Sequence, residues 1–272
     1  MAQEKLTDEN ERYIIDWLND KNDGRPYFLL KFCQEERFAK DICAGNLFAN
    51  TPKWFRNKEN ESGVRGQGDA YELILPMRFD KVEICNPQTK DIICELGNGS
   101  GQFQIKDDDV KPLVSFVGIT INEMHPVRVT EDEACFRFPF SEEEFEHMSR
   151  EFGPYCVVVG EKFLRQRISE YAETHHVNYI FDAVHYCESN NIDRMLAFGA
   201  AKSNRFLYKN EDLKYQREYR LALDMDLPKD HFIRLGNISA AASYIDSREM
   251  RNMEVVIHYQ TKKVICDDSQ LK

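Results

Sequence analysis

The residues best suited to chemistry lie between Lys209 and Asp224, where Gln216, Glu218 and Arg220 alternate with mostly apolar side chains. Successive side chains of a β-strand point to opposite faces, so these three would line one face at spacings of about 7 Å. A carboxylate held beside an amide and a guanidinium can stabilise a positively charged sugar. The alternative is that the three polar side chains only coat the solvent-exposed face of an antiparallel sheet.

Arg220 has two possible roles in this pattern. It could bind a pyrophosphate, or it could pair with Glu218 and keep that carboxylate ionised. The surrounding segment is locally basic within an acidic protein, and such an island often faces an anionic ligand such as a phosphate. The alternative is a chance fluctuation of surface charge. Between residues 202 and 220 the charged residues are Lys202, Arg205, Lys209, Lys214, Arg217 and Arg220 against Glu211, Asp212 and Glu218.

Charged residues in the first third of the chain could complete a binding site. Lys31 interrupts an apolar run and could bind a phosphate as a point charge, or it could reach a sheet edge or pair with a carboxylate. Arg65 precedes the glycine-rich stretch 66–68, whose backbone amides could cradle a phosphate. Asp69 and Glu72 could form a second acidic corner, although acidic residues in loops are usually solvated.

Aromatic residues could stack on a base or a nicotinamide ring, although side chains of this kind usually belong to the core. The candidates are Tyr27, Phe32, Phe55 and Tyr71.

Local patterns predict the elements that must position these residues. Apolar alternation and capping signals predict one α+β domain over residues 1–272, built mostly from antiparallel strands with packed helices. An N-terminal helix is expected within residues 1–22, and a mobile glycine-containing loop over residues 57–69. The remaining predicted helices cover 34–44, a turn from Pro52, 141 onward, 162–173 and 191–198, and the predicted strands cover 27–32, 47–50, 71–77, 81–85, 91–95, 113–121, 155–159, 177–187, 216–223, 232–235, 254–258 and 263–266.

Composition restricts the class of protein. The net charge of −11 argues against general coating of nucleic acid, and no apolar run is long enough to span a bilayer. The polar, acidic N-terminus is unlike a signal peptide, so a cytoplasmic location is expected. The eight cysteines never form C-x-x-C, which is typical of reduced cysteines rather than a zinc site, and no metal site is predicted.

Three segments together resemble a family of uncharacterised bacterial proteins often found with mobile elements and phage-defence genes. The segments are 27–48 (a strand, a helix and a strand, with Lys31 in the first strand), 66–72 (GQGDAYE) and 207–221 (ending in Glu-Tyr-Arg-Leu). They cover about a third of the chain.

At a greater distance the same layout resembles ADP-ribosyltransferases, with an ADP-ribosyltransferase-like split β-sheet. Gln216-Arg217-Glu218 matches the Gln-x-Glu motif of that family. The resemblance implies that Glu218 hydrogen-bonds the nicotinamide ribose of NAD and stabilises the oxocarbenium ion, while Gln216 orients the acceptor. Thr51 falls where the Ser/Thr motif lies, but Lys31 stands where the family has Arg or His.

The resemblance therefore implies an NAD-cleaving, possibly ADP-ribosylating effector in a toxin-like or phage-defence role, with a protein or nucleic-acid acceptor. Lys31, Arg65 and Arg220 would contact phosphates, and Glu218→Gln would abolish turnover while leaving the fold intact. The alternative is a non-enzymatic binding module with a degenerate site, which senses a nucleotide or a phage component. A nuclease, suggested by the basic segment alone, is a third possibility.

Overall fold

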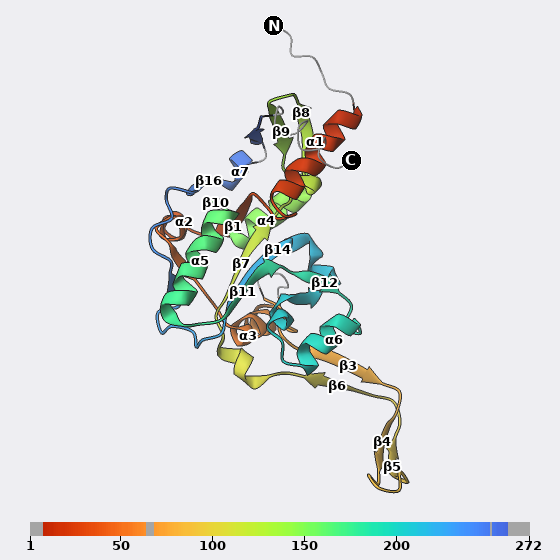
Figure 1. The fold of residues 1–272 in the computed structure, drawn as a ribbon. Coiled ribbons are helices and arrows are strands. Elements are labelled where there is room, and N and C mark those ends of the chain that lie inside the picture. Colours follow the sequence, from red (N-terminus) through yellow and green to blue (C-terminus); the bar gives the residue numbers. More distant parts are fainter. Residues whose placement is uncertain (1–7, 64–67, 251, 261–272) are drawn as a thin grey trace. The chain divides into compact units, whose positions relative to one another are not determined.

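The computed structural model describes residues 8–63, 68–250 and 252–260 (Figure 1). Their contacts group the chain into two compact units: unit 1 (Met1–Gly45, Phe116–Ile168 and Gly236–Lys272) and unit 2 (Asn46–Ser115 and Ser169–Leu235). The chain is of mixed α and β class with multi-stranded antiparallel pairing, as expected. Whether the units form one domain stays a prediction. None of the described helices is long and apolar enough to cross a membrane.

The main sheet of unit 1 contains four neighbouring strands. Their order in the sheet is the C-terminal half of β7, then β1, β10 and β16. Strand β1 pairs antiparallel with β10, which places Leu30 opposite Val158 and Phe32 opposite Cys156. A second sheet has the order β17-β9-β8. The elements of unit 1 are α1 (Asp8–Lys21), β1 (Phe28–Cys33), α2 (Glu36–Cys43), β7 (Leu113–Gly118, from Phe116), η2 (Ile121–Glu123), β8 (His125–Val129), β9 (Glu133–Arg137), α4 (Glu142–Phe152), β10 (Tyr155–Gly160), the start of α5 (Glu161–His175), β16 (Ala242–Asp246), α7 (Ser247–Met250) and β17 (Glu254–His258).

Local signals explain the ends of two helices in unit 1. Helix α4 begins at a reciprocal capping box, in which the Ser141 hydroxyl accepts from the Glu144 amide and the Glu144 carboxylate accepts from the Ser141 amide. Gly45 follows α2 with a φ of 87°, and a Cβ there would lie 1.7 Å from the carbonyl oxygen of Gly236. Only glycine fits that position, so the predicted end of this helix is confirmed.

Unit 2 contains most of the predicted site residues. Strands β11 and β14 pair antiparallel, and β14 is also next to β7. Strands β12 and β13 pair in parallel, and β15 pairs with β2. The elements of unit 2 are β2 (Asn46–Phe48), α3 (Pro52–Ser62), β3 (Leu75–Phe79), β4 (Val82–Cys85), β5 (Ile92–Leu96), β6 (Gly99–Phe103), η1 (Lys106–Val110), the start of β7, the end of α5, β11 (Tyr179–Ala183), β12 (His185–Cys187), α6 (Ile192–Gly199), η3 (Ser203–Leu207), β13 (Tyr208–Asn210), η4 (Glu211–Gln216), β14 (Glu218–Leu223) and β15 (Phe232–Arg234).

Among the predictions for unit 2, those for the loop 57–69 and the strand 177–187 are wrong. Helix α3 continues to Ser62, so the first part of the predicted loop 57–69 is helical; Thr51 caps this helix and left-handed Gly63 ends it. Gly68 and Asp69 are buried, while residues 64–67 lie outside the described part of the chain. The predicted strand 177–187 is divided at Val184, which is buried and whose amide donates to the carbonyl of Glu218.

Candidate functional site

The carboxylate of Glu218 lies at the start of β14 and is held from three directions. Its Oε1 accepts hydrogen bonds from Ser115 Oγ at 2.5 Å and from Arg220 Nε at 2.6 Å. Its Oε2 accepts from Lys209 Nζ at 2.9 Å. Every residue of β14 is buried, so the alternative in which these polar residues coat a solvent-exposed face is wrong. Glu218 and Arg220 do share one face, as strand alternation predicts.

Arg220 joins Glu218 to a second carboxylate. Its Nη1 and Nη2 donate to the two oxygens of Glu72 at 2.6 and 3.0 Å, which is the two-pronged geometry that a planar guanidinium favours. Nη1 also donates to the carbonyl of Phe206 at 2.8 Å. Of the two roles considered for Arg220, pairing with Glu218 is the one observed.

Gln216 lies outside the strand, contrary to prediction. It ends η4, and Arg217 then adopts a left-handed conformation with a φ of 46° before β14 begins. Gln216 still reaches the cluster, because its Oε1 accepts from Lys209 Nζ at 2.9 Å. Lys209 therefore connects Gln216 with Glu218, and its ammonium lies 3.9 Å from Glu72.

We call Glu72, Lys209, Glu218 and Arg220 the buried charge cluster. Their exposed fractions are 2, 6, 5 and 1 %, respectively. Two carboxylates balance two cations, which is the condition under which charges can be buried without a prohibitive desolvation cost. A group that stabilises a sugar cation must touch the sugar, whereas both Glu218 oxygens already accept hydrogen bonds. The arrangement therefore favours a structural role for Glu218.

The two carboxylates have opposite pKa shifts. Burial by itself raises the pKa of Glu218, but Arg220, Lys209 and the hydrogen bonds from Arg220 and Ser115 together hold it below its ordinary value. Burial also raises the pKa of Glu72, and there it outweighs the attraction of Arg220 and Lys209. Since like-charged neighbours titrate as a coupled pair, Glu72 is the member expected to take up a proton first.

This order predicts a pH dependence. Glu218 has a lowered folded-state pKa, so its ionised form stabilises the fold above the unfolded-state pKa, and that stabilisation is lost as the pH falls toward the folded-state pKa. Glu72 has a raised pKa, so its protonation favours the folded state as the pH falls. The stability difference between wild type and Glu72→Gln should therefore vanish at a higher pH than the difference between wild type and Glu218→Gln.

Urea unfolding of the three proteins between pH 7 and pH 3 measures both differences. The remaining carboxylates are common to all three proteins and cancel when wild type is compared with each variant. The reverse order of disappearance would contradict the assigned pKa directions.

The other predicted site residues do not belong to the buried charge cluster. Lys31 belongs to unit 1, where its ammonium lies 5.8 Å from the centre of the Phe116 ring. The Thr51 hydroxyl caps α3 by accepting from the Trp54 amide at 3.2 Å. Asp69 is buried near the cluster, and its Oδ1 accepts from the Tyr71 amide at 2.9 Å. Arg65 lies outside the described residues.

The sequence suggested that the basic segment 202–220 faces an anionic ligand. The structure does not bring its six cations together on one anion-binding surface. Lys209 and Arg220 are in the buried charge cluster. Arg205 makes a two-pronged pair with the buried Asp108, at 2.7 and 2.5 Å. Three of the six cations are thus paired with internal carboxylates.

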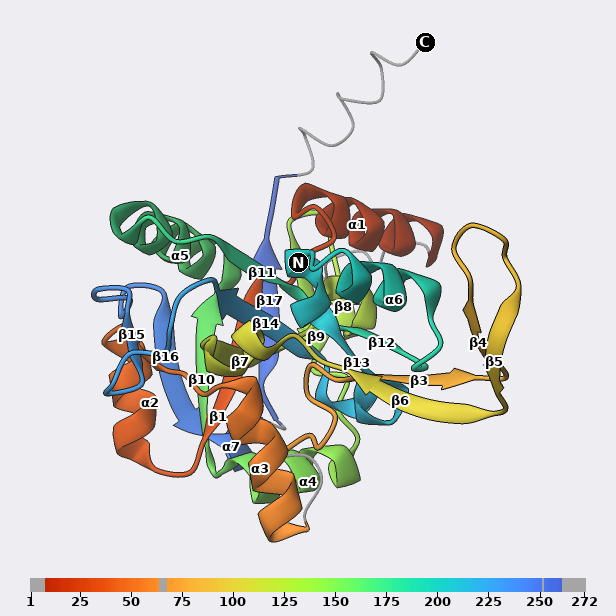
Figure 2. The ribbon, with the colours of Figure 1, turned by 90° about the horizontal axis from the view of Figure 1, so that it is seen from below.

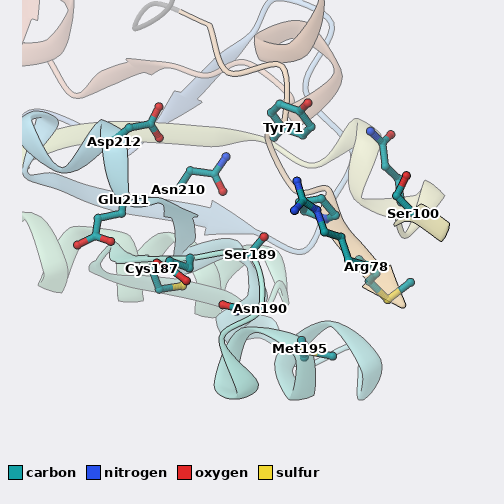
Figure 3. Close-up of a pocket in the computed structure, with 15 residues that line it drawn as sticks. Tyr71, Arg78, Ser100, Cys187, Ser189, Asn190, Met195, Asn210, Glu211 and Asp212 are labelled. Carbon is teal, nitrogen blue, oxygen red and sulfur yellow. The ribbon is translucent and has the colours of Figure 1, made fainter. Parts of the chain in front are cut away.

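A pocket of about 1220 Å³ opens elsewhere in unit 2 (Figure 3). Tyr71 and Arg78 lie on one side of it, with Glu211 and Asp212 on the other. Its lining comes from the turn before β3, from β3 and β6, from the end of β12, the segment after it and α6, and from the end of β13 and the start of η4. The lining residues are Tyr71, Pro76, Met77, Arg78, Ser100, Gly101, Gln102, Cys187, Glu188, Ser189, Asn190, Met195, Asn210, Glu211 and Asp212.

The pocket and the buried charge cluster share the same short segments of chain. Tyr71, which lines the pocket, precedes Glu72, and Asn210 follows Lys209. The Asn210 side chain is fixed, because its Oδ1 accepts from Nη1 of the buried Arg194 at 2.8 Å. Two lining positions are therefore anchored by buried polar contacts, which favours a preformed site.

Ser115 and Lys209 were not predicted as site residues. Ser115 is a polar residue within an apolar strand, and Lys209 was counted only as part of the basic segment. Of the four aromatic residues considered for stacking, Tyr71 lines the pocket and is 40 % exposed, whereas Phe32 belongs to the core of unit 1. Among the residues described, no group of three or more His, Cys, Asp or Glu side chains is placed to hold a metal ion.

Comparisons of the chain with protein-family models, with curated proteins and with solved structures gave no match. The function is therefore inferred from the site itself.

Proposed function

We propose that unit 2 is a binding module that senses a nucleoside or a nucleoside monophosphate without converting it. The observation that carries this proposal is the composition of the pocket, which combines one partly exposed aromatic ring with amides and carboxylates. Tyr71 offers a face on which a base can stack. Gln102, Asn190 and Asn210 supply amides that can both donate to and accept from a base edge.

The charges of the pocket limit the ligand. Glu188, Glu211 and Asp212 can accept hydrogen bonds from ribose hydroxyls, as acidic residues do in dinucleotide sites. Arg78 is the one cation among the lining residues and could meet a single phosphate. Each further phosphate would bring negative charge toward three carboxylates. Ribonucleosides and their monophosphates should therefore bind more tightly than NAD, diphosphates or triphosphates.

A thermal-shift series tests this order. The full chain is heated with the four ribonucleosides, their 5′-mono-, di- and triphosphates, and NAD, because a ligand that binds only the folded state raises the melting temperature. We expect the largest increase with a nucleoside or monophosphate and a smaller one with each added phosphate. A melting temperature that rises with phosphate number would contradict the charge argument.

NAD cleavage at Glu218 is a second candidate, supported by one observation. The cations Arg220 and Lys209 favour the ionised form of Glu218, and that is the form needed to stabilise an oxocarbenium ion. Sugar contact would require Lys209 or Ser115 to give up its hydrogen bond to the carboxylate.

Incubation with NAD, with chromatography of released nicotinamide, tests this candidate. Glu218→Gln is the catalytic variant and Glu72→Gln the control for damage to the cluster. Release by wild type and Glu72→Gln, but not by Glu218→Gln, would establish cleavage. The binding proposal predicts no release from any of them.

A further inference from the structure

Helix α6 exposes apolar side chains of the kind that a surface helix usually buries. The helix follows β12 and lies beside β3 of the same unit (Figure 1, Figure 2). Ile192, Met195 and Leu196 are 70, 43 and 60 % exposed. Their spacing of three and four residues places them on one side of the helix. We call these three residues the α6 stripe, and an exposed stripe of this kind is typical of a surface that another molecule covers.

The buried side of α6 fixes this orientation. Phe198 packs in a hydrophobic core cluster of unit 2. Arg194 is buried, and its guanidinium donates to Asn210 Oδ1 at 2.8 Å and to the carbonyl of Ile74 at 3.1 Å. Rotating the helix to bury the α6 stripe would take this cation away from its acceptors, which is costly inside a protein. The stripe is therefore held on the outside of unit 2.

Carboxylates gather at the N-terminal end of the α6 stripe. Glu188 precedes the helix, Asp193 is its second residue and Glu211 begins η4, and all three are exposed. Burial is the largest cause that raises the pKa of the Cys187 thiol, and Arg194 opposes it. The charges of Glu211 and Asp193 raise this pKa further, so both carboxylates lie near the sulfur. No residue in the described part of the chain forms an ion pair with any of the three carboxylates.

These carboxylates decide which molecule can cover the stripe. An anionic membrane or a nucleic acid would be repelled. A second copy that packed its own α6 stripe here about a two-fold axis would bring the same carboxylates together, which is also unfavourable. A segment with an apolar face and lysine or arginine at its edge gains twice, because its apolar side chains leave water and its cations meet carboxylates.

We infer that the α6 stripe docks a basic amphipathic helix of a partner protein. The eight residues of α6 span about 12 Å, which matches about two turns of a partner helix. The cations of the partner would lie over the N-terminal end of α6, because the exposed Lys202 follows its C-terminal end.

The size of the stripe sets the strength of docking. A standard interface buries about 800 Å² on each partner, and three partly exposed side chains supply only a fraction of that area. Docking is therefore weak and reversible, with a dissociation constant on the order of 10 micromolar or higher.

Fluorescence anisotropy of a labelled synthetic peptide, titrated with the full chain, tests the inference. The probe has about 14 residues, enough to form a helix when bound, with leucine recurring every three or four positions and lysine beside it. One comparison peptide has glutamate in place of lysine. The other keeps the composition of the probe but distributes its leucines around the helix. We expect saturable binding of the probe, and much weaker binding of both comparison peptides.

Substitutions on α6 identify the surface involved. Ile192→Ser and Leu196→Ser should each weaken binding of the probe by about tenfold, because each removes a large apolar contact. Ile84→Ser is the matched control, since Ile84 is 54 % exposed on β4 and should leave binding unchanged. Asp193→Asn should weaken binding by about threefold, the effect of one exposed ion pair, whereas Glu143→Gln on α4 should not.

The three α6 positions to be changed do not line the pocket. Nucleoside binding should therefore be the same in these variants as in wild type, and the inference does not depend on the proposed function.

Several results would overturn the inference. One is the absence of saturable probe binding, and another is equal binding of either comparison peptide. Equal weakening by Leu196→Ser and Ile84→Ser would show general adhesion to exposed apolar side chains. Flotation of the chain with phosphatidylcholine vesicles, or dimerisation in sedimentation velocity, would assign the stripe to a different occupant if Leu196→Ser abolished it.

Discussion

Glu218→Gln is expected to lower the free energy of unfolding by about 3–5 kcal/mol, the range found when one partner of a buried ion pair is removed. The substitution keeps the shape of the side chain but removes its charge. Arg220 and Lys209 would then remain buried with only Glu72 to balance them. The loss is a large part of a typical total of about 5–15 kcal/mol. Urea unfolding at pH 7 measures it.

Two further variants keep this prediction testable if Glu218→Gln unfolds. Glu72→Gln should not lower the free energy of unfolding at pH 7, because burial raises the pKa of Glu72 and so favours its neutral form in the folded state, which glutamine resembles. The double variant Glu218→Gln/Lys209→Met removes the cation together with its partner, so it should be more stable than the sum of the single changes predicts. Wild-type stability in Glu218→Gln would mean that the carboxylate is not structural, and would favour the catalytic hypothesis.

Tyr71→Ala is expected to weaken binding of a ribonucleoside by about 5- to 150-fold, which corresponds to the loss of about 1–3 kcal/mol of stacking on one base. The fold should be little affected, since the Tyr71 side chain is partly exposed and the turn is held by hydrogen bonds of its backbone. Titration calorimetry of wild type and variant measures the change.

Tyr13→Ala is the matched control for this experiment. Tyr13 lies on α1 of unit 1 and is 45 % exposed, close to the value for Tyr71, but it is not part of the pocket. Equal affinities of Tyr71→Ala and wild type would show that the base does not stack there. Equal weakening by both alanine variants would indicate non-specific association with exposed aromatic rings.

The sequence predicted the site contacts between residues that are close in the chain. It missed the contacts between residues that are far apart in the chain. Strand alternation correctly placed Glu218 and Arg220 on one face, because this relation depends only on neighbours along β14. It could not place Glu72, which bonds Arg220 across 148 residues of chain. Nor could it predict the left-handed Arg217, which moves Gln216 out of the strand, because ordinary side chains avoid that conformation unless other contacts impose it.

The same distinction applies to the fold. The Ser141 capping box and the glycine after α2 are local signals, and both predicted helix ends are observed. The extension of α3 to Ser62 was missed because a polar stretch with a late glycine resembles a loop. The pocket could not be predicted, because its lining comes from segments between Tyr71 and Asp212 that only the folded chain brings together.

The most direct test of the central claim is titration calorimetry of the full chain with the four ribonucleosides, followed by chromatography of the recovered ligand. We expect saturable binding of at least one nucleoside at one site per chain, with the ligand recovered intact. Absence of binding by all four, or recovery of a free base, would contradict a binding module that senses its ligand without converting it.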